Sequence, residues 1–490
     1  MKKIIFAGIL CLIAATDVVG VGIELSLRDA IRIAQINSVD AAVALNELQS
    51  AYWGYRTYRA DQLPEITFTG TLPSYSNQYS RYQQPDGSYT YIQNNWLGMS
   101  GELSVSQNIA LTGGKVALNT SLDFTRQLGA GARNEYMSIP VGLTFTQPLF
   151  GVNTYKWNRR IEPLRYQEAK AAYIEQVEQV TLAAISYFFN LLLACESRDI
   201  ALQNLANADK LYEVALAKRA IGYISEIELM QLQLTALQAK GAVTEAIANM
   251  NAQMFRLSTF LGLNEGDTIT PVMPEGAPSL RMNYNEVLDK ALENNAFAKS
   301  IMRKQLEADY SVASAKGNMR SISLFASVGY TGKDKILEDT YRRLRGNQIV
   351  EIGVSIPLLD WGKRKGKVRV AESNRELTES KNRQDRMSFN QDIFLLVENF
   401  NNQAAQLEIA EQADLIAAKR YATTVETFMV GKINVLDLND ARNSKDESRL
   451  KYIEQLYLYW NYFYNIRSVT LWDFVSGTNL DADFEELVRK

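Results

Sequence analysis

The chain has 490 residues, and its 52 Lys and Arg against 55 Asp and Glu leave a net charge of −3, so no broad basic field points to nucleic acid. Hydrophobic residues make up 47% of it, which is enough for large buried interfaces and excludes a mostly disordered chain. It contains no histidine, which removes the commonest general base and the usual imidazole metal ligand. The composition favours a structural role over catalysis, and we expect no enzymatic activity, no cofactor and no metal.

Residues 1–20 have the pattern of a secretory signal peptide. Two lysines precede an apolar run from Ile4 to Ala15, and small residues follow it. The run is about 12 residues, shorter than the ~20 that a membrane-spanning helix needs. Cleavage would remove Cys11 and leave Cys195, which lies in an apolar run and is expected in the core. No later run is apolar without interruption for ~18 residues, so we expect strands to make any membrane crossing.

The chain contains two copies of one unit. The apolar pattern that begins at Leu27 returns 257 residues later, whereas Pro148 and Gly222 match Pro357 and Gly431 at an offset of 209. The constant distance from the proline to the glycine, 74 residues in each copy, predicts helices of equal length. The two offsets differ by 48, which places an insertion in the sheet region of the first copy.

The domain organisation follows from this duplication. We expect a signal peptide at residues 1–20, a first repeat at 21–265, a linker at 266–280, a second repeat at 281–476 and a C-terminal tail at 477–490. Each repeat holds a helix, membrane strands and a long helical hairpin. The tips of the two hairpins lie near residues 222 and 431.

Alternating apolar and polar residues predict two-faced β-strands. These strands occupy about residues 64–147 in the first repeat and about residues 321–331 and 348–356 in the second. The insertion predicts an extra hairpin at about residues 101–126, with a Thr-Gly-Gly turn between its strands. The polar segments 75–95 and 331–347 are expected to be loops outside a membrane.

Long stretches without glycine predict long helices. Residues 152–221 contain no glycine and one proline, Pro163, so we expect a helix of up to about 55 residues. Apolar residues at 3,4 spacing from Val177 to Ala215 form a coiled-coil seam. A second seam beside it contains Leu182, Ile185, Phe189 and Leu192. Two seams on one helix predict neighbours on two sides, as in a closed ring of helices.

An open sheet edge in lipid would leave backbone groups unpaired at a cost of several kcal/mol each. Closed membrane barrels begin at about eight strands. One chain supplies four predicted strands, or six with the extra hairpin, so other copies must close the sheet. Three chains with four strands each would give twelve. A soluble four-helix coiled coil would explain the seams, but it leaves the signal and the alternating strands unexplained.

The chain resembles the TolC-like outer membrane efflux family in its duplicated order, in the strand exits at residues 147–150 and 357–362, and in the tips at residues 222–229 and 431–438. The resemblance implies a mixed α and β membrane protein, with a trimeric transmembrane β-barrel continuous with a long periplasmic α-helical barrel. It places the protein in the outer membrane with a large periplasmic portion. The extra hairpin departs from the family pattern.

The same resemblance implies the exit duct of a tripartite efflux or secretion pump. The expected partners are two further copies of the chain, a periplasmic adaptor protein, an inner-membrane transporter and outer-membrane lipid, with no nucleic acid. The duct itself would perform no chemistry. Two other functions fit part of the sequence: a passive outer-membrane porin, and a structural coiled-coil scaffold.

The helix tips are the candidate adaptor contacts. Gly222 and Gly431 can adopt a positive φ after a helix, which allows the chain to reverse. Apolar residues around the turns could dock into adaptor helices or only close each hairpin. These residues are Ile224, Ile227, Ile433 and Leu436.

The resemblance also implies an acidic ring at a closed periplasmic aperture, at positions that match Asp437 and Asp440. Threefold symmetry would bring six carboxylates together, and such a ring favours cations. Asn434 and Asp437 have the spacing of a capping box, as do Ser225 and Glu228, so Asp437 could instead cap a helix. Asp440 lies beyond the capping turn and is the better gating candidate.

Two further clusters are prominent in the second repeat. Five basic residues follow its last predicted strand: Lys363, Arg364, Lys365, Lys367 and Arg369. They form either a solvated helix start or a contact with inner-leaflet phosphates. An aromatic stretch from Tyr452 to Tyr464 is expected to pack between helices, because its setting is helical.

Overall fold

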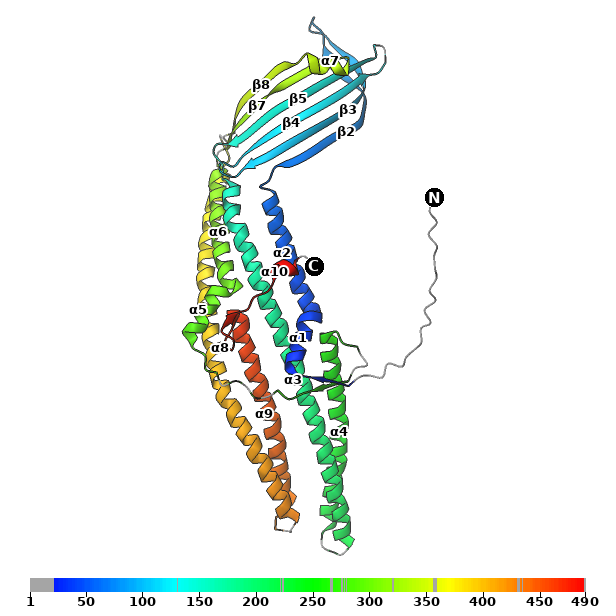
Figure 1. Ribbon diagram of the computed structural model, residues 1–490, viewed down its shortest axis with the longest axis vertical. Coiled ribbons are helices and arrows are strands. Elements are labelled where there is room, and N and C mark those ends of the chain that lie inside the picture. The colour runs from blue at the N-terminus through cyan, green and yellow to red at the C-terminus, as the bar shows by residue number, and fades with distance from the viewer. Residues whose placement is uncertain are drawn as a thin grey trace, which may run out of the picture. The chain divides into compact units, whose positions relative to one another are not determined.

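The computed structural model describes residues 22–488, except residues 130, 221, 223, 265–267, 275, 277, 279, 320, 356–358, 430–431 and 434. The predicted signal peptide lies outside the described residues. The chain forms two compact units, each built from three segments. The first contains the chain up to Glu47, Ala171–Asn295 and Phe389–Leu487, and the second contains Leu48–Lys170, Ala296–Ser388 and the last residues. Figure 1 labels the elements.

The shorter helices of the two repeats have equal lengths. Helices α1 (Leu27–Asn37) and α5 (Tyr284–Asn294) both have 11 residues, and α2 (Val39–Ala60) and α6 (Ala296–Gly317) both have 22. In both pairs the first residues are 257 positions apart. The offset found in the sequence therefore holds for whole helices, which confirms the internal duplication.

The long helices are equal as well. Helices α3 (Thr154–Ala220) and α8 (Lys363–Met429) both have 67 residues, and α4 (Glu226–Leu261) and α9 (Val435–Thr470) both have 36, at an offset of 209. The expected limit of about 55 residues for α3 was wrong, because Pro163 lies inside the helix. A proline inside a helix removes one backbone hydrogen bond. Two ion pairs join the same part of α3 to α6, one between Arg165 and Glu307 and one between Glu168 and Arg303.

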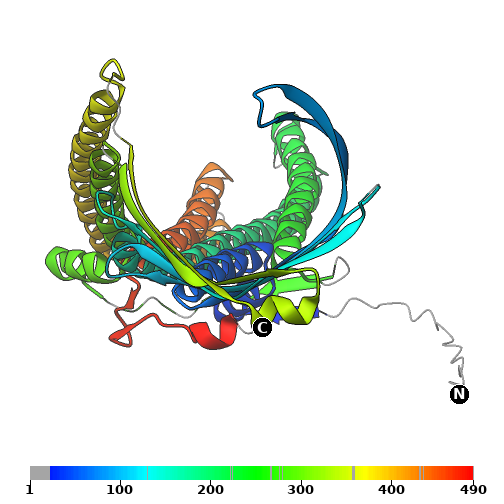
Figure 2. The ribbon, with the colours of Figure 1, turned by 90° about the horizontal axis from the view of Figure 1, so that it is seen from above.

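A six-stranded sheet occupies the second unit, with the order β2-β3-β4-β5-β7-β8. Its strands are β2 (Glu65–Gln83), β3 (Tyr89–Ile109), β4 (Gly114–Gln127), β5 (Arg133–Pro148), β7 (Ser321–Asp334) and β8 (Arg345–Ser355). All neighbours are antiparallel, and Figure 2 shows that the sheet is curved. The inserted hairpin is paired within this sheet as parts of β3 and β4, so one chain supplies six strands.

The first polar segment, residues 75–95, is mostly strand and not the expected loop. Strands β2 and β3 stay paired up to Gln83 and Tyr89, which leaves a short turn between them. The sequence does not show these parts of β2 and β3 as strands, because polar side chains replace the alternating apolar ones there. They pair across the hairpin instead, as where the Gln93 amide donates to Asn77 at 2.9 Å.

The expected linker at residues 266–280 contributes a strand. Strand β6 (Thr268–Pro271) pairs in parallel with β1 (Gly22–Leu25). Both strands bury an apolar side chain in the core, since Leu25 is 1% exposed and Ile269 is 4% exposed. Strands of four residues are too short to show a clear period in the sequence.

Two other segments expected to be irregular hold short elements. The second polar segment, residues 331–347, contains the short helix α7 (Leu337–Arg342), where the Thr340 carbonyl accepts a hydrogen bond from Ser138 of β5 at 3.2 Å. The C-terminal region contains β9 (Trp472–Asp473), β10 (Thr478–Asn479) and α10 (Phe484–Leu487), the last two within the expected tail.

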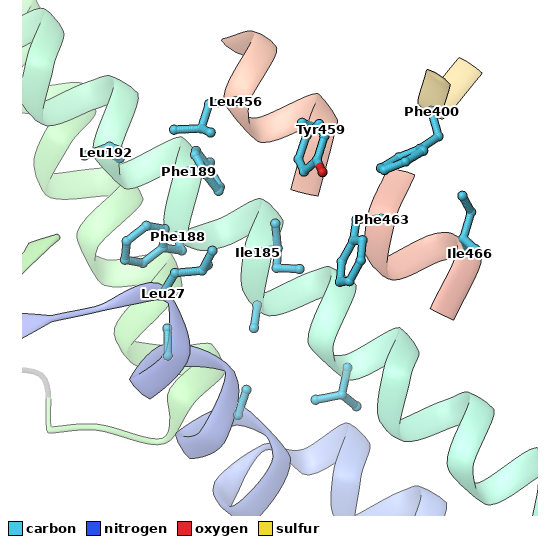
Figure 3. Close-up of a cluster of buried hydrophobic side chains, with 14 of the residues drawn as sticks. Leu27, Ile185, Phe188, Phe189, Leu192, Phe400, Leu456, Tyr459, Phe463 and Ile466 are labelled. Carbon is cyan, nitrogen blue, oxygen red and sulfur yellow. The ribbon is translucent and has the colours of Figure 1, made fainter. Parts of the chain in front are cut away.

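The main apolar core lies in the first unit, around α3. Tyr187 contacts Phe260 of α4 with ring centroids 4.8 Å apart, and Phe189 contacts Tyr457 of α9 at 5.6 Å. Helix α3 therefore has neighbours on two sides, as its two seams predict. Figure 3 shows this cluster. By length and composition, α3 alone among the described helices could cross a membrane, but 56% of its most apolar window is buried within the chain.

The aromatic stretch of α9 packs against α8, as expected from its helical setting. Tyr459 is 1% exposed, and its ring centroid lies 5.2 Å from that of Phe400 (Figure 3). Phe463, one turn farther along α9, has its ring centroid 6.4 Å from that of Phe400. Burial raises the pKa of the Tyr459 hydroxyl to about 12, and this hydroxyl donates to the Pro278 carbonyl. These contacts fix the pairing of the second helical hairpin.

We predict that Phe400→Ala destabilises this unit by about 3–5 kcal/mol, because it leaves a cavity among side chains that cannot collapse fully. The measurement is the apparent melting temperature of the helical circular dichroism signal in detergent. Phe400→Leu keeps most of the volume and should cost about 1 kcal/mol. Equal losses for the two variants would contradict the packing assigned to Phe400.

Candidate functional site: the helical tips

The tip between α3 and α4 reverses at a glycine. Gly222 has a φ of 75°, and its backbone N–H donates to the Arg219 carbonyl at 3.0 Å. No atom lies within 4 Å of the place where a Cβ would stand. Backbone conformation, and not crowding, therefore requires glycine at this position.

Helix α4 begins with a complete capping box. The Ser225 hydroxyl accepts the backbone N–H of Glu228 at 3.2 Å, and the Glu228 carboxylate accepts the backbone N–H of Ser225 at 2.8 Å. Two backbone donors that the helix leaves without a partner are thus satisfied. These hydrogen bonds from the Ser225 backbone and hydroxyl lower the pKa of the Glu228 carboxyl below its usual value of 4.5.

The tip between α8 and α9 is described only in part. Gly431 and Asn434, the predicted turn glycine and capping residue, lie outside the described residues. Leu436 is 75% exposed, and Ile227 at the other tip is 73% exposed. Ile433 is half-buried and lines a groove of about 540 Å³ along α8. The other residues that line this groove are Ile416, Lys419, Arg420, Thr423, Thr424 and Thr427.

The two candidate aperture acids lie one turn apart at the start of α9 but have different surroundings. Asp437 is exposed in the first turn, where a negative charge favours the helix. Asp440 forms an ion pair with Arg420 of α8, and both side chains are more than half exposed. The charge of Asp440 is therefore partly compensated within the chain. Among the described residues, no group of three or more His, Cys, Asp or Glu could hold a metal ion.

An apolar stripe on α4 has no partner within the described part of the chain. Ile227, Met230, Leu234 and Leu237 are between 53% and 73% exposed and follow one another at the 3,4,3 spacing of a coiled-coil seam. The 3,4,3 spacing of these four residues is visible in the sequence and could have been recognised there. A four-residue apolar stripe on a long helix is typical of a surface that another helix covers.

Polar contacts join the two hairpins above the tips. Arg449 of α9 bridges Glu196 of α3 at 2.8 Å and Asp414 of α8 at 3.3 Å. Closer to the tips, the Asn204 amide donates to Asp446 at 2.9 Å. The sequence could not reveal these pairs, because their members are distant in the chain and occupy ordinary surface positions of helices.

The family model described as outer membrane efflux protein matches residues 30–263 and 287–468. The chain belongs to this family. The matched segments coincide with the two structural repeats, so the family pattern covers both copies. The chain is therefore an outer-membrane protein, as its sequence predicts.

One curated relative is the cobalt-zinc-cadmium resistance protein CzcC of Cupriavidus metallidurans, which is 22% identical over 275 residues. This match covers 55% of the chain and 62% of CzcC, so it spans less than two thirds of that relative's length.

Several solved outer membrane channels share the fold. The Campylobacter jejuni channel CmeC has a TM-score of 0.66 at 15% identity, over 94% of this chain and 88% of CmeC. The Vibrio cholerae protein VceC has a TM-score of 0.63 at 14% identity, over 93% of this chain and 97% of VceC. The open state of the Neisseria gonorrhoeae channel MtrE has a TM-score of 0.60 at 14% identity, over 94% of this chain and 90% of MtrE.

We predict that the start of α4 loosens in acid. The lowered pKa of Glu228 means that its stabilising effect is present above pH 4.5 and is lost as the pH falls through the lower folded-state value. Hydrogen exchange in the first turn of α4, corrected for intrinsic rates, should show protection that declines over this range. Glu228→Gln should make the protection of this turn weak and independent of pH. A pH-dependent loss that persists in this variant would assign the effect to another group.

Proposed function

We propose that the chain is the outer-membrane exit duct of a tripartite efflux pump, which passes small molecules or other exported substrates from the periplasm to the exterior without chemistry of its own. Membership of the outer membrane efflux protein family supports this proposal. The observation that carries it is the pair of surfaces that one chain leaves incomplete. They are the two edges of the sheet and the apolar stripe of α4.

Each incomplete surface calls for further copies of the chain. Strand β2 pairs only with β3, and β8 pairs only with β7, within the part of the chain that the structure describes. In lipid, the free backbone groups of both edges need partners. A homotrimer would join β8 of each copy to β2 of the next and close eighteen strands, six from each chain. The stripe of α4 would meet a helix of the neighbouring copy in the same ring.

The helix tips are proposed to bind a periplasmic adaptor protein, which links the duct to an inner-membrane transporter. Exposed apolar side chains stand at both tips, Ile227 on one and Leu436 on the other. The groove lined by Ile433 and Ile416 adds a further, partly apolar surface near the second tip for an adaptor to contact. The transporter would supply the energy and select the cargo.

We predict that the purified protein in detergent has the mass of three chains. The expected mass, after correction for detergent, is about three times that of one chain in light scattering or native mass spectrometry. Leu234→Glu together with Leu237→Glu should weaken the assembly, because the charges would be buried in the helix ring. The control is Gln233→Glu together with Gln238→Glu, which adds the same charge at two exposed positions of α4. A stable monomer in detergent would contradict the proposed trimeric duct.

We predict that the tip acids set ion selectivity. In bilayer recordings the wild type should be mostly closed without partners and should favour cations. Asp437→Ala with Asp440→Ala should reduce cation selectivity and block by multivalent cations several-fold. Arg420→Ala should act in the opposite direction, because it removes the cation that compensates Asp440.

The control for these recordings is Glu286→Ala with Glu293→Ala, which removes the same charge at α5. Unchanged selectivity in the tip variant would remove the aperture assignment. A large standing conductance of the wild type alone would favour a passive porin over a gated duct.

A further inference from the structure

The cations at the start of α8 take no part in the contacts proposed above for the duct. Helix α8 has no acidic residue in its first turn, and cations near a helix N-terminus are electrostatically unfavourable. The Asp360 carboxylate already accepts the backbone N–H groups of Gly362 at 3.0 Å and Arg364 at 3.2 Å. These two backbone N–H groups are therefore satisfied without an external anion. The basic side chains that follow add positive charge that the helix start does not need.

Two of these cations line a polar groove between the end of α6 and the start of α8. The groove has a volume of about 470 Å³ and no carboxylate among its lining residues. Its polar lining residues are Tyr310, Ser311, Ser314, Asn318, Arg364 and Lys367. A groove that combines cations with hydroxyl and amide groups and lacks acids has the composition of an oxyanion site.

The hydrogen-bond donors of this groove are held in place by the protein but keep N–H and O–H groups that a ligand could engage. The Arg364 Nη1 donates to the Met319 carbonyl at 2.7 Å, which holds the guanidinium while leaving its other N–H groups without a partner in the described chain. Lys367 has no ion pair or hydrogen bond there. The Asn318 amide donates to the Ser314 hydroxyl at 3.4 Å, so that hydroxyl can donate its own proton. We propose that this groove binds a phosphate group.

The surroundings favour a lipid headgroup as the source of that phosphate. Strand β7 begins at Ser321, three residues after Asn318, so the groove adjoins the end of the sheet. Trp361, just before α8, is 90% exposed and has a φ of 54°, a conformation that bulky residues rarely adopt. Leu359 is 71% exposed. Exposed tryptophan beside basic residues is typical of a membrane interface, where cations attract anionic lipids.

The first repeat shows that the fold does not require this chemistry. Because the helices have equal lengths, Arg364 and Lys367 correspond to Tyr155 and Asn158 at the offset of 209. Asn318 corresponds to Asp61 at the offset of 257. The equivalent place in the first repeat thus has no cation at these positions and one carboxylate. The combination of cations without a carboxylate at these positions is thus a feature of the second repeat.

The test compares wild type with Arg364→Gln plus Lys367→Gln in the full-length protein. Native mass spectrometry counts bound phosphatidylglycerol and bound phosphatidylcholine, and calorimetry measures binding of inorganic phosphate. The matched control is Lys381→Gln plus Arg383→Gln, which removes the same charge farther along α8. We expect retention of phosphatidylglycerol over phosphatidylcholine in wild type and control, and a loss of roughly tenfold or more in the groove variant. Adding Trp361→Ser to the groove variant should lower the number of bound phosphatidylglycerol molecules further.

Phosphatidylglycerol binding that depends on Arg364 and Lys367 supports the lipid headgroup. Binding of inorganic phosphate with the same dependence, and no preference between the two lipids, supports the phosphate site but assigns it a soluble anion. Equal binding by the groove variant and the control overturns the proposal. All four substituted cations are exposed or half-buried, so assembly should persist, and the mass spectrum itself verifies it.

Discussion

The backbone hydrogen bonds of the sheet edges are the constraint on which the rest depends. A strand in lipid cannot exchange its missing partners for water, so β2 and β8 must be paired by something outside the chain. The four remaining strands of the sheet, β3, β4, β5 and β7, are each paired on both sides within the chain. Among the described strands, the two edges are therefore the places where a neighbour can join the sheet, and a cyclic arrangement of identical copies would satisfy both at once.

The duplication provides the long helices that such a ring needs. Equal lengths of 67 and 36 residues in both repeats mean that the two hairpins end at comparable depth when they pack side by side. The core around Phe189 joins α3 to α9, and the core around Phe400 joins α8 to α9. Arg449 adds an ion-paired bridge between the same helices nearer the tips. The function proposed for the tips thus depends on packing between helices of the two repeats.

The sequence was most informative where a period extends over many turns. The two offsets, the seams of α3 and the capping box at Ser225 are all read from regular spacing, and the structure shows the corresponding elements. Hairpin β2–β3 was missed over residues 75–95, because cross-strand polar pairs replace apolar alternation there. Of the candidate site, the turn at Gly222 and the capping box of Ser225 and Glu228 could be predicted. The Arg420–Asp440 pair could not, since its members are on different helices.

The inserted hairpin has a geometric consequence for the rim of the proposed trimer. Neighbouring strands lie about 4.8 Å apart, so two additional strands widen the sheet of one chain by roughly 10 Å. Three copies lengthen the circumference by about 30 Å. The circumference of the wall is then about one and a half times that of a twelve-stranded wall. A wall of that size encloses a lumen of porin dimensions. Sieving of cargo would then fall to the narrow periplasmic mouth, and the outward end would act as a wide, permanently hydrated vestibule.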